Sequence, residues 1–359
     1  MRYRLLGASG LRVSEIALGA MTFSDRDLSW GASPEQSRAI FHAFADAGGT
    51  FIDTASIYGD MFGGEDHSSE RVLADLLAGD REHFVLATKY TSSNTTDVSR
   101  SGNSVKSMRQ SIDASLRALR TDYVDVLWLH MWDGTTPVEE VLRGVQQLVS
   151  AGKILYFGFS DTPAWVVSHA VALARARGWT PPIAVQVEYS LAERTAEREL
   201  LPMAEALDLG ILAWGPLAGG VLTGKYTGTD GRGGRYGNMA FSAKVGPLDE
   251  HRLRVGRALD GVAAKLGHPA SQVALAWLRN RPGVVIPIVG ARQPDQLTEN
   301  LAGLDLVLPD ESLAELEAAS APALGFPEAF LAHELARSFR TSGHYDAIDN
   351  HRALHYPAR

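Results

Sequence analysis

The chain has 359 residues, of which 45% are hydrophobic and 21% are charged, a composition that suffices for the core of a globular protein. Its net charge of −8 argues against nucleic acid or an anionic membrane as the main partner, because both attract clusters of Lys and Arg. The absence of cysteine excludes disulfide bonds, thiolate catalysis and cysteine metal sites within this chain.

The first predicted element is a β-hairpin over residues 3–13, whose strands meet at a Gly-Ala-Ser-Gly turn. Helical patterns then alternate with short apolar runs. In residues 33–49, for example, Ser33 can cap a helix, Pro34 occupies its first position, and a glycine pair ends it. The apolar runs, which we expect to be strands, cover residues 15–20, 50–55, 84–89, 124–130, 154–160, 183–190, 210–216 and 284–290.

Eight apolar strands separated by helices predict a (β/α)8 TIM barrel of the α/β class. A doubly wound open sheet is the alternative, and it would carry the G-x-G-x-x-G fingerprint after its first strand. Residues 18–25, LGAMTFSD, do not contain that fingerprint. We therefore predict a single domain over residues 1–359, with the barrel in residues 1–320 and the N-terminal hairpin closing its amino end.

Two segments fall outside the repeating pattern. Residues 217–249 predict a long glycine-rich loop at the face of the barrel where the strands end, and long ordered loops tend to be functional. Residues 321–359 form a C-terminal tail that either lies over the active-site face or trails free. No apolar run reaches the roughly 18 residues of a membrane span, and the N-terminus lacks a signal-peptide core, so we expect a cytoplasmic protein.

In such barrels the chemistry gathers at the carboxyl ends of the strands. The second strand ends at Asp53, and Tyr58 follows shortly after it. The third strand ends at Lys89 and the fourth at His130. Each residue alone has an ordinary explanation as a cap, a loop anchor, a solvated terminus or a core histidine. On three adjacent strand ends, however, the four side chains are expected to meet.

These four groups make chemical sense together. A free tyrosine has a pKa of about 10 and is a poor proton donor at neutral pH. The Lys89 ammonium would lower the pKa of Tyr58, and Asp53 would pair with Lys89. His130 can donate a hydrogen bond to a carbonyl oxygen. The combination predicts protonation of an oxygen that gains negative charge. The sequence contains no G-x-S-x-G, P-loop or H-E-x-x-H motif, and its scattered histidines indicate no metal site.

Seven motifs occur in order along the chain: FIDTASIYGD, ATKY, LWLH, GFSD, VQVEYSL, WGPLAGGVLTGKY and VGARQPDQLTEN. Together they resemble the aldo-keto reductases, in the branch similar to potassium-channel β-subunits and aryl-alcohol dehydrogenase-like enzymes, over about residues 1–320. The resemblance implies reduction of an aldehyde or ketone by NADPH, with Tyr58 as general acid. It places the catalytic tetrad of the family on the four residues selected above.

The resemblance also implies a cofactor site without a Rossmann unit. Ser160, Asp161 and Gln186 would hold the nicotinamide amide, and Trp214 would stack on the ring. Relatives often have Asn at position 161, and an aspartate cannot donate to the carboxamide oxygen. Arg292 would bind the adenosine 2′-phosphate with the backbone of residues 290–291, which favours NADPH over NADH although NADH stays possible. The other implied cofactor residues are Gly19, Met21, Asp53, Pro216, Leu217, Gly219, Lys225, Gly290, Gln296 and Asn300.

The predicted substrate is a small-molecule aldehyde or ketone. Aromatic side chains at the catalytic face would line its pocket together with two members of the tetrad: Trp30, Tyr58, Tyr90, His130 and Trp132. A nicotinamide-binding regulatory or redox-sensing subunit with little turnover is the alternative, and a barrel isomerase or lyase without a redox cofactor is a third interpretation. A homo-oligomer, the physiological substrate and the reaction direction stay open.

Overall fold

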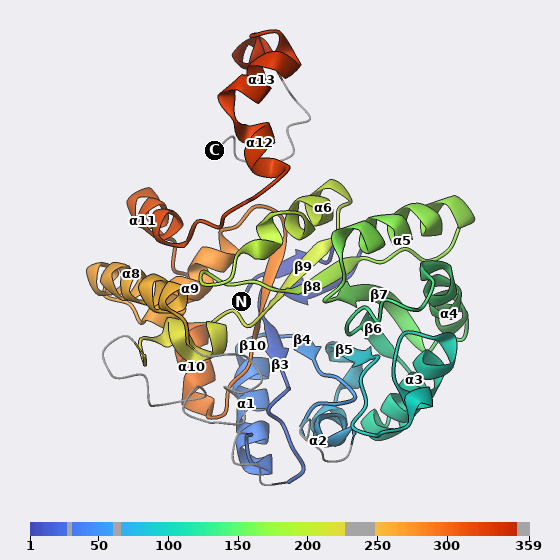
Figure 1. Ribbon diagram of the computed structural model, residues 1–359. Coiled ribbons are helices and arrows are strands. Elements are labelled where there is room, and N and C mark those ends of the chain that lie inside the picture. The colour runs from blue at the N-terminus through green and yellow to red at the C-terminus, as the bar shows by residue number, and fades with distance from the viewer. Residues whose placement is uncertain (27–30, 60–65, 227–247, 350–359) are drawn as a thin grey trace.

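The computed structural model describes residues 1–26, 31–59, 66–226 and 248–349. Eight parallel strands form a closed barrel in the order β10-β3-β4-β5-β6-β7-β8-β9, which confirms the predicted fold (Figure 1). The strands are β3 (Ala17–Gly19), β4 (Phe51–Asp53), β5 (Val85–Tyr90), β6 (Val124–Leu129), β7 (Ile154–Ser160), β8 (Ala184–Glu188), β9 (Gly210–Trp214) and β10 (Val285–Val289).

Helices surround the barrel. They are α1 (Pro34–Asp46), α2 (Ser68–Leu77), α3 (Val105–Leu119), α4 (Val138–Ser150), α5 (Ala164–Arg177), α6 (Leu200–Ala206), α8 (Glu250–Leu266), α9 (Ala270–Arg279), α10 (Pro294–Ala302) and α11 (Asp310–Ser320). Short 3-10 helices cover Arg81–His83, Val98–Arg100, Thr195–Glu197, Ala218–Thr223 and Tyr345–Ala347. No helix in the described ranges is both long and apolar enough to cross a membrane.

The start of α1 shows how local sequence fixes an element. The Ser33 hydroxyl accepts a hydrogen bond from the Gln36 backbone N–H at 3.2 Å, and the Gln36 side-chain oxygen accepts from the Ser33 N–H at 2.8 Å. This reciprocal pair is a capping box, and Pro34 follows Ser33 at the first helical position. The capping prediction for this helix is confirmed.

The N-terminal hairpin pairs β1 (Tyr3–Leu5) with β2 (Arg12–Ser14) in antiparallel register. Leu6 is fully buried and packs against the barrel interior. A side chain at Gly7, whose φ is +55°, would meet the Ile183 carbonyl oxygen at 2.1 Å, so only glycine fits between the hairpin and the strand start. The hairpin thus closes the amino end of the barrel, as predicted.

Two hydrophobic layers follow from the alternation of side chains along each strand. Phe51, Ala87 and Trp128 belong to the layer inside the barrel. Ile52, Leu86 and Leu127 belong to the layer between strands and helices. Every strand therefore has an inward and an outward series of side chains, and this parity decides which terminal residues reach the site.

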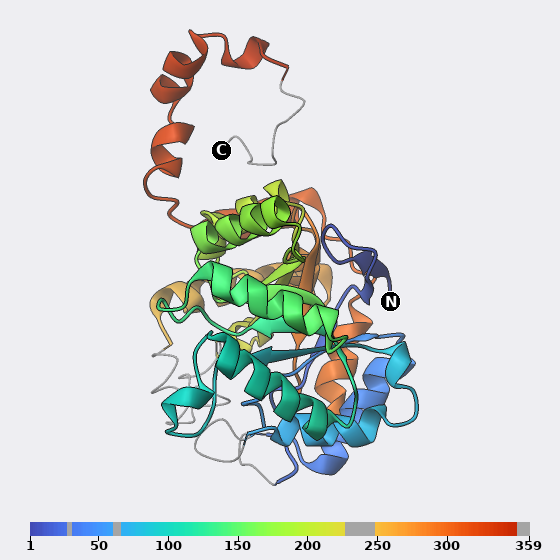
Figure 2. The same cartoon turned by 90° about the vertical axis from the view of Figure 1, so that its right-hand side faces the viewer.

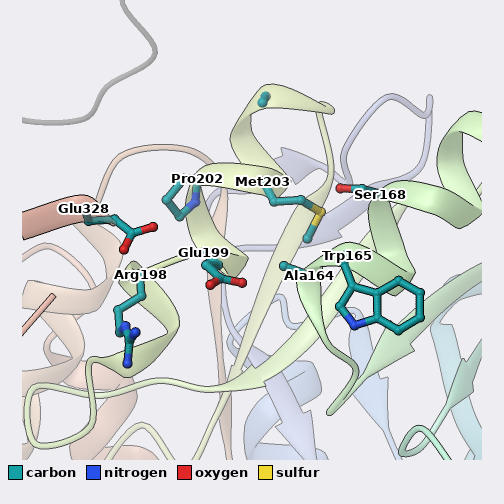
Figure 3. Close-up of a pocket in the computed structure, with 9 residues that line it drawn as sticks. Ala164, Trp165, Ser168, Arg198, Glu199, Pro202, Met203 and Glu328 are labelled. Carbon is teal, nitrogen blue, oxygen red and sulfur yellow. The ribbon is translucent and has the colours of Figure 1, made fainter. Parts of the chain in front are cut away.

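The C-terminal tail leaves the barrel after α11 and forms α12 (Glu328–Ala332) and α13 (Glu334–Thr341). Both views show these helices standing away from the barrel beside α6, and they do not cross its carboxyl end (Figures 1 and 2). At the base of the tail, Glu328 and Arg198 border a shallow hollow of about 310 Å³ between α5 and α6 (Figure 3). This hollow lies on the outside of the barrel, apart from the strand ends.

Candidate active site

Polar side chains of the inward series gather at the carboxyl end of the barrel. The registers place Asp53 beside Gly19 and Ser160 beside Gln186 on neighbouring strands. Seven side chains of the inward series lie at or just after the carboxyl ends of six consecutive strands: Asp53, Lys89, His130, Ser160, Gln186, Glu188 and Trp214. The sequence analysis predicted this convergence for Asp53, Lys89 and His130, and the structure places the other four side chains at the same end of the barrel.

The centre of the site is a buried ion pair. Lys89 and Asp53 are 0% and 2% exposed, and the Lys89 ammonium donates a hydrogen bond to the Asp53 carboxylate. Lys89 Nζ also donates to the Thr54 carbonyl oxygen at 2.9 Å. The second carboxylate oxygen of Asp53 accepts from Gln186 Nε2 at 2.9 Å. Each buried charge thus has an opposite charge and a further hydrogen-bond partner beside it, as buried charges require.

Tyr58 and His130 lie next to this pair. Lys89 Nζ is 4.5 Å from the centroid of the Tyr58 ring. The Tyr58 and His130 rings meet edge to face, with centroids 5.7 Å apart and planes at 83°. The His130 backbone N–H donates to the Tyr90 carbonyl oxygen at 3.1 Å. All four predicted catalytic residues therefore occupy one site.

The acidity of Tyr58 differs from expectation. Burial raises the pKa of the Tyr58 phenol, and the Lys89 ammonium lowers it only in part, while the Asp53 carboxylate raises it further. The predicted effect of Lys89 has the right direction, but the predicted net lowering of the pKa is wrong. The main reason is burial of the phenol, which outweighs the Lys89 charge, and the Asp53 carboxylate adds to it. Tyr58 therefore stays protonated at neutral pH, which is the form that a proton donor needs.

Lys89 and His130 differ in charge at neutral pH. Burial works against the ammonium, but the Asp53 carboxylate and the Tyr58 phenol outweigh it and raise the pKa of Lys89. Burial and the nearby Lys89 charge lower the pKa of His130 to about 3. His130 is therefore a neutral imidazole at neutral pH. Its Nδ1 atom is shielded from solvent and has no hydrogen-bond partner.

The β7–β8 side of the site has polar groups that fit a nicotinamide carboxamide. The buried Ser160 hydroxyl has no hydrogen-bond partner among the described residues. Gln186 donates through its amide nitrogen to Asp53, and its side-chain oxygen is an acceptor. A hydroxyl donor and an amide acceptor on adjacent strands complement the oxygen and the amino group of a carboxamide.

Asp161 does not act as the amide donor that Asn would be. Its carboxylate accepts a hydrogen bond from Trp214 Nε1 at 2.9 Å. Its backbone N–H donates to the Gln186 carbonyl oxygen at 3.2 Å, and its own carbonyl accepts from the Trp132 N–H at 3.3 Å. Asp161 has a φ of +40°, in the left-handed region that aspartate and asparagine tolerate best among residues with side chains. Asp161 therefore joins the loop after β6 to the carboxyl ends of β8 and β9.

Further predicted cofactor residues follow β9 and β3 in the sequence. Pro216 is buried, Leu217 is half-buried, and Gly219 adopts a φ of +66° in the turn that follows β9. Lys225 is exposed two turns further on. The Met21 carbonyl accepts from the Gly59 N–H at 3.3 Å, next to Tyr58.

The loop after β10 lies beside β3. A side chain at Gly19 would meet Ile288 at 2.8 Å, and one at Gly290 would meet the Gly19 carbonyl oxygen at 3.4 Å. The Gln296 side-chain oxygen accepts from the Arg292 backbone N–H at 3.0 Å, so it serves the loop itself. Asn300 is 5% exposed on α10, while the Arg292 side chain keeps contact with solvent. Arg292 is thus a basic group available just before the start of α10.

One of the predicted substrate residues is corrected by the structure. Tyr90 is fully buried in the layer between strands and helices, because it follows the inward-facing Lys89 and so points outward. Its hydroxyl has no partner, and it cannot line a substrate site. Trp132 is half-buried on the loop after β6, and Trp30 lies outside the described residues.

Sequence reasoning missed Glu188, which ends β8 in the inward series. Burial and the neighbouring Glu193 carboxylate raise the pKa of Glu188, with a further contribution from Asp161. The strand-end rule that selected Asp53 and Lys89 would have found it in the segment VQVEYS. Among the described residues, no cluster of acidic and histidine side chains could hold a metal ion.

Comparison with known proteins gives a consistent result. The family model described as "Aldo/keto reductase family" matches residues 15–321. The chain is 39% identical to a norsolorinic acid reductase of Aspergillus flavus, over 95% of this chain and 86% of the relative. It is 35% identical to an aryl-alcohol dehydrogenase [NADP(+)] of Phanerodontia chrysosporium, over 96% and 93% of the two chains. An aryl-alcohol dehydrogenase of Pestalotiopsis microspora is also 35% identical, over 92% and 85%.

Proposed function

The chain belongs to the aldo/keto reductase family, and on that premise we propose that it reduces an aldehyde or ketone to an alcohol with NADPH, with Tyr58 as the general acid. It is an oxidoreductase that acts on carbonyl or CH–OH groups. The observation that carries the proposal is the buried Lys89–Asp53 pair beneath the Tyr58 ring, with His130 at its edge.

Each member of the tetrad has a role that follows from its protonation state. Neutral His130 donates a hydrogen bond to the carbonyl oxygen and orients it. Protonated Tyr58 gives its proton to this oxygen as negative charge develops there. The Lys89 ammonium stabilises the phenolate that remains, and Asp53 holds Lys89 in place. The bound cofactor supplies the hydride.

We propose that the nicotinamide lies between Trp214 and the tetrad. Ser160 would donate to the carboxamide oxygen through its unpartnered hydroxyl, and Gln186 would accept from the amino group. Arg292 would bind the 2′-phosphate, which distinguishes NADPH from NADH. The naming of the Phanerodontia chrysosporium relative for NADP(+) supports this preference.

We further propose an aromatic carbonyl as the substrate class. Relatives that cover most of this chain are named norsolorinic acid reductases and aryl-alcohol dehydrogenases. The half-buried Trp132, whose backbone is bonded to Asp161, supplies an aromatic face near the site. A regulatory subunit without turnover has no comparable support.

The test follows NADPH absorbance with an activated aromatic aldehyde for the wild type and Tyr58→Phe. We expect Tyr58→Phe to lose carbonyl reduction by about 100- to 10,000-fold, the usual contribution of a general acid. NADPH affinity should stay unchanged, because only the phenol oxygen is removed. Tyr90→Phe is the matched control, since its hydroxyl has no partner and lies outside the site. Retained turnover in Tyr58→Phe would remove Tyr58 from the proposed role.

A further inference from the structure

Two carboxylates, those of Asp161 and Glu188, lie at the nicotinamide side of the site. The Lys89 charge is already paired with Asp53. Within the described part of the chain, neither Asp161 nor Glu188 forms an ion pair, although both lie near the strand ends that carry Ser160, Gln186 and Trp214. The described half of the site that faces Trp214 is therefore negatively charged.

Asp161 is the carboxylate that touches a proposed cofactor-binding side chain. It accepts the Trp214 indole N–H at 2.9 Å and so fixes the plane of the ring. Its left-handed backbone conformation and two backbone hydrogen bonds hold the carboxylate in this position. An asparagine oxygen could make the same bond to Trp214 without a charge. The negative charge is thus a separate property of this residue.

We infer that Asp161 positions Trp214 and makes the site favour oxidised, positively charged nicotinamide over the reduced, neutral form. The inference rests on the proposed function, because it requires a nicotinamide beside Trp214. Hydride transfer moves two electrons to the carbonyl carbon, and the proton comes from Tyr58. Hydride donation leaves a positive charge on the nicotinamide ring. A fixed carboxylate near the ring would stabilise that charge, and so it would favour hydride donation to the carbonyl in the enzyme-bound complex.

The pH dependence of cofactor binding provides a second test of the inference. Partial removal from water raises the pKa of Asp161, against the Trp214 N–H and the Lys89 charge, which lower it. The other ionisable groups that interact with Asp161 are Tyr58 and Glu188, and Arg252 acts on Glu188. As the pH falls through this raised pKa, Asp161 takes up a proton, and the preference for the oxidised cofactor should disappear.

The experiment measures the dissociation constants of NADP+ and NADPH by titration calorimetry for the wild type and Asp161→Asn. We expect the ratio Kd(NADPH)/Kd(NADP+) to fall about tenfold in Asp161→Asn, the size of a unit-charge interaction at a partly solvated site. Asn keeps the acceptor for Trp214 and tolerates the left-handed backbone, so folding is preserved. The wild-type ratio should also fall as the pH is lowered through the raised pKa of Asp161, and the Asn variant should not show this change. Both nucleotides carry the 2′-phosphate, so its titration affects the two dissociation constants equally and cancels in their ratio.

Asp122→Asn is the matched control, because Asp122 is an exposed carboxylate just before β6, at the opposite end of the barrel. The ratio Kd(NADPH)/Kd(NADP+) of Asp122→Asn should equal that of the wild type. An unchanged ratio in Asp161→Asn, or an equal fall in Asp122→Asn, would overturn the inference. If the wild type bound neither nucleotide, the proposed function itself would fail, which is a different result.

Discussion

The two halves of the barrel's carboxyl end differ in how completely their polar groups are satisfied. On the β4–β6 half, Asp53 and Lys89 are buried and bonded to each other and to their neighbours. On the β7–β9 half, the Ser160 hydroxyl has no partner and Asp161 has a left-handed backbone. Gln186 bridges the halves through its bond to Asp53.

This difference indicates how the buried polar groups of each half are stabilised. A buried ion pair must be complete in the folded chain, because each charge alone would be costly. A buried hydroxyl without a hydrogen-bond partner destabilises the folded chain less than an unpaired buried charge does, and a bound ligand can supply the missing partner. We therefore expect mutations in the β4–β6 half to affect folding and chemistry together. Mutations in the β7–β9 half, or in the loop after β10, should affect mainly cofactor binding.

The largest effect should come from Lys89→Met. It removes the ammonium and leaves the Asp53 carboxylate buried without its partner. We expect the free energy of unfolding, measured by urea denaturation, to fall by about 3–5 kcal/mol, with loss of carbonyl reduction. Asp53→Asn combined with Lys89→Met should recover part of the stability. A single variant as stable as the wild type would contradict a complete, buried pair.

The pH dependence of stability should be smaller. The pKa of His130 is about 3 in the folded chain, against an ordinary value near 6.5, so the unfolded chain takes up the proton first. Stability due to His130 is therefore lost as the pH falls from about 6.5 toward 3. Between pH 7.5 and 5 we expect a loss of about 2 kcal/mol that is absent in His130→Gln. Parallel stability curves for the two proteins would show that His130 titrates normally.

On the cofactor half, Arg292→Ala removes a basic side chain just before the start of α10. We expect NADPH binding to weaken by about tenfold, because a charge-assisted contact to the 2′-phosphate is lost. NADH has no such phosphate, so its affinity should hardly change. Titration calorimetry with both nucleotides measures the difference. Equal losses would mean that Arg292 does not read the 2′-phosphate.

The smallest effect should come from Ser160→Ala. The hydroxyl makes no bond in the chain itself, so the free energy of unfolding without cofactor should not fall. Nicotinamide nucleotides should bind about fivefold more weakly, the value of roughly one hydrogen bond. Ser107→Ala is a matched control, because its buried hydroxyl on α3 also has no partner. Loss of stability without loss of binding in Ser160→Ala would assign the hydroxyl to the fold.

The sequence could have predicted the positions of Tyr90 and Glu188, but not the pKa of Tyr58. Strand alternation predicts that Tyr90 points away from the site once Lys89 points inward, so that error was avoidable. The same rule applied to β8 would have selected Glu188. The net pKa of Tyr58 was out of reach, because it depends on how fully the fold removes the phenol from water and on how far Asp53 neutralises Lys89.

By itself the sequence determined the eight-stranded barrel, the closing hairpin and the strand ends that carry the tetrad, because hydrophobic periodicity and caps are local properties of the chain. Only the tertiary structure decided the bond from Trp214 to Asp161 and the bridge from Gln186 to Asp53. These contacts join residues on different strands of a closed barrel. Their geometry depends on register and loop conformation, which the order of residues in any one segment does not fix.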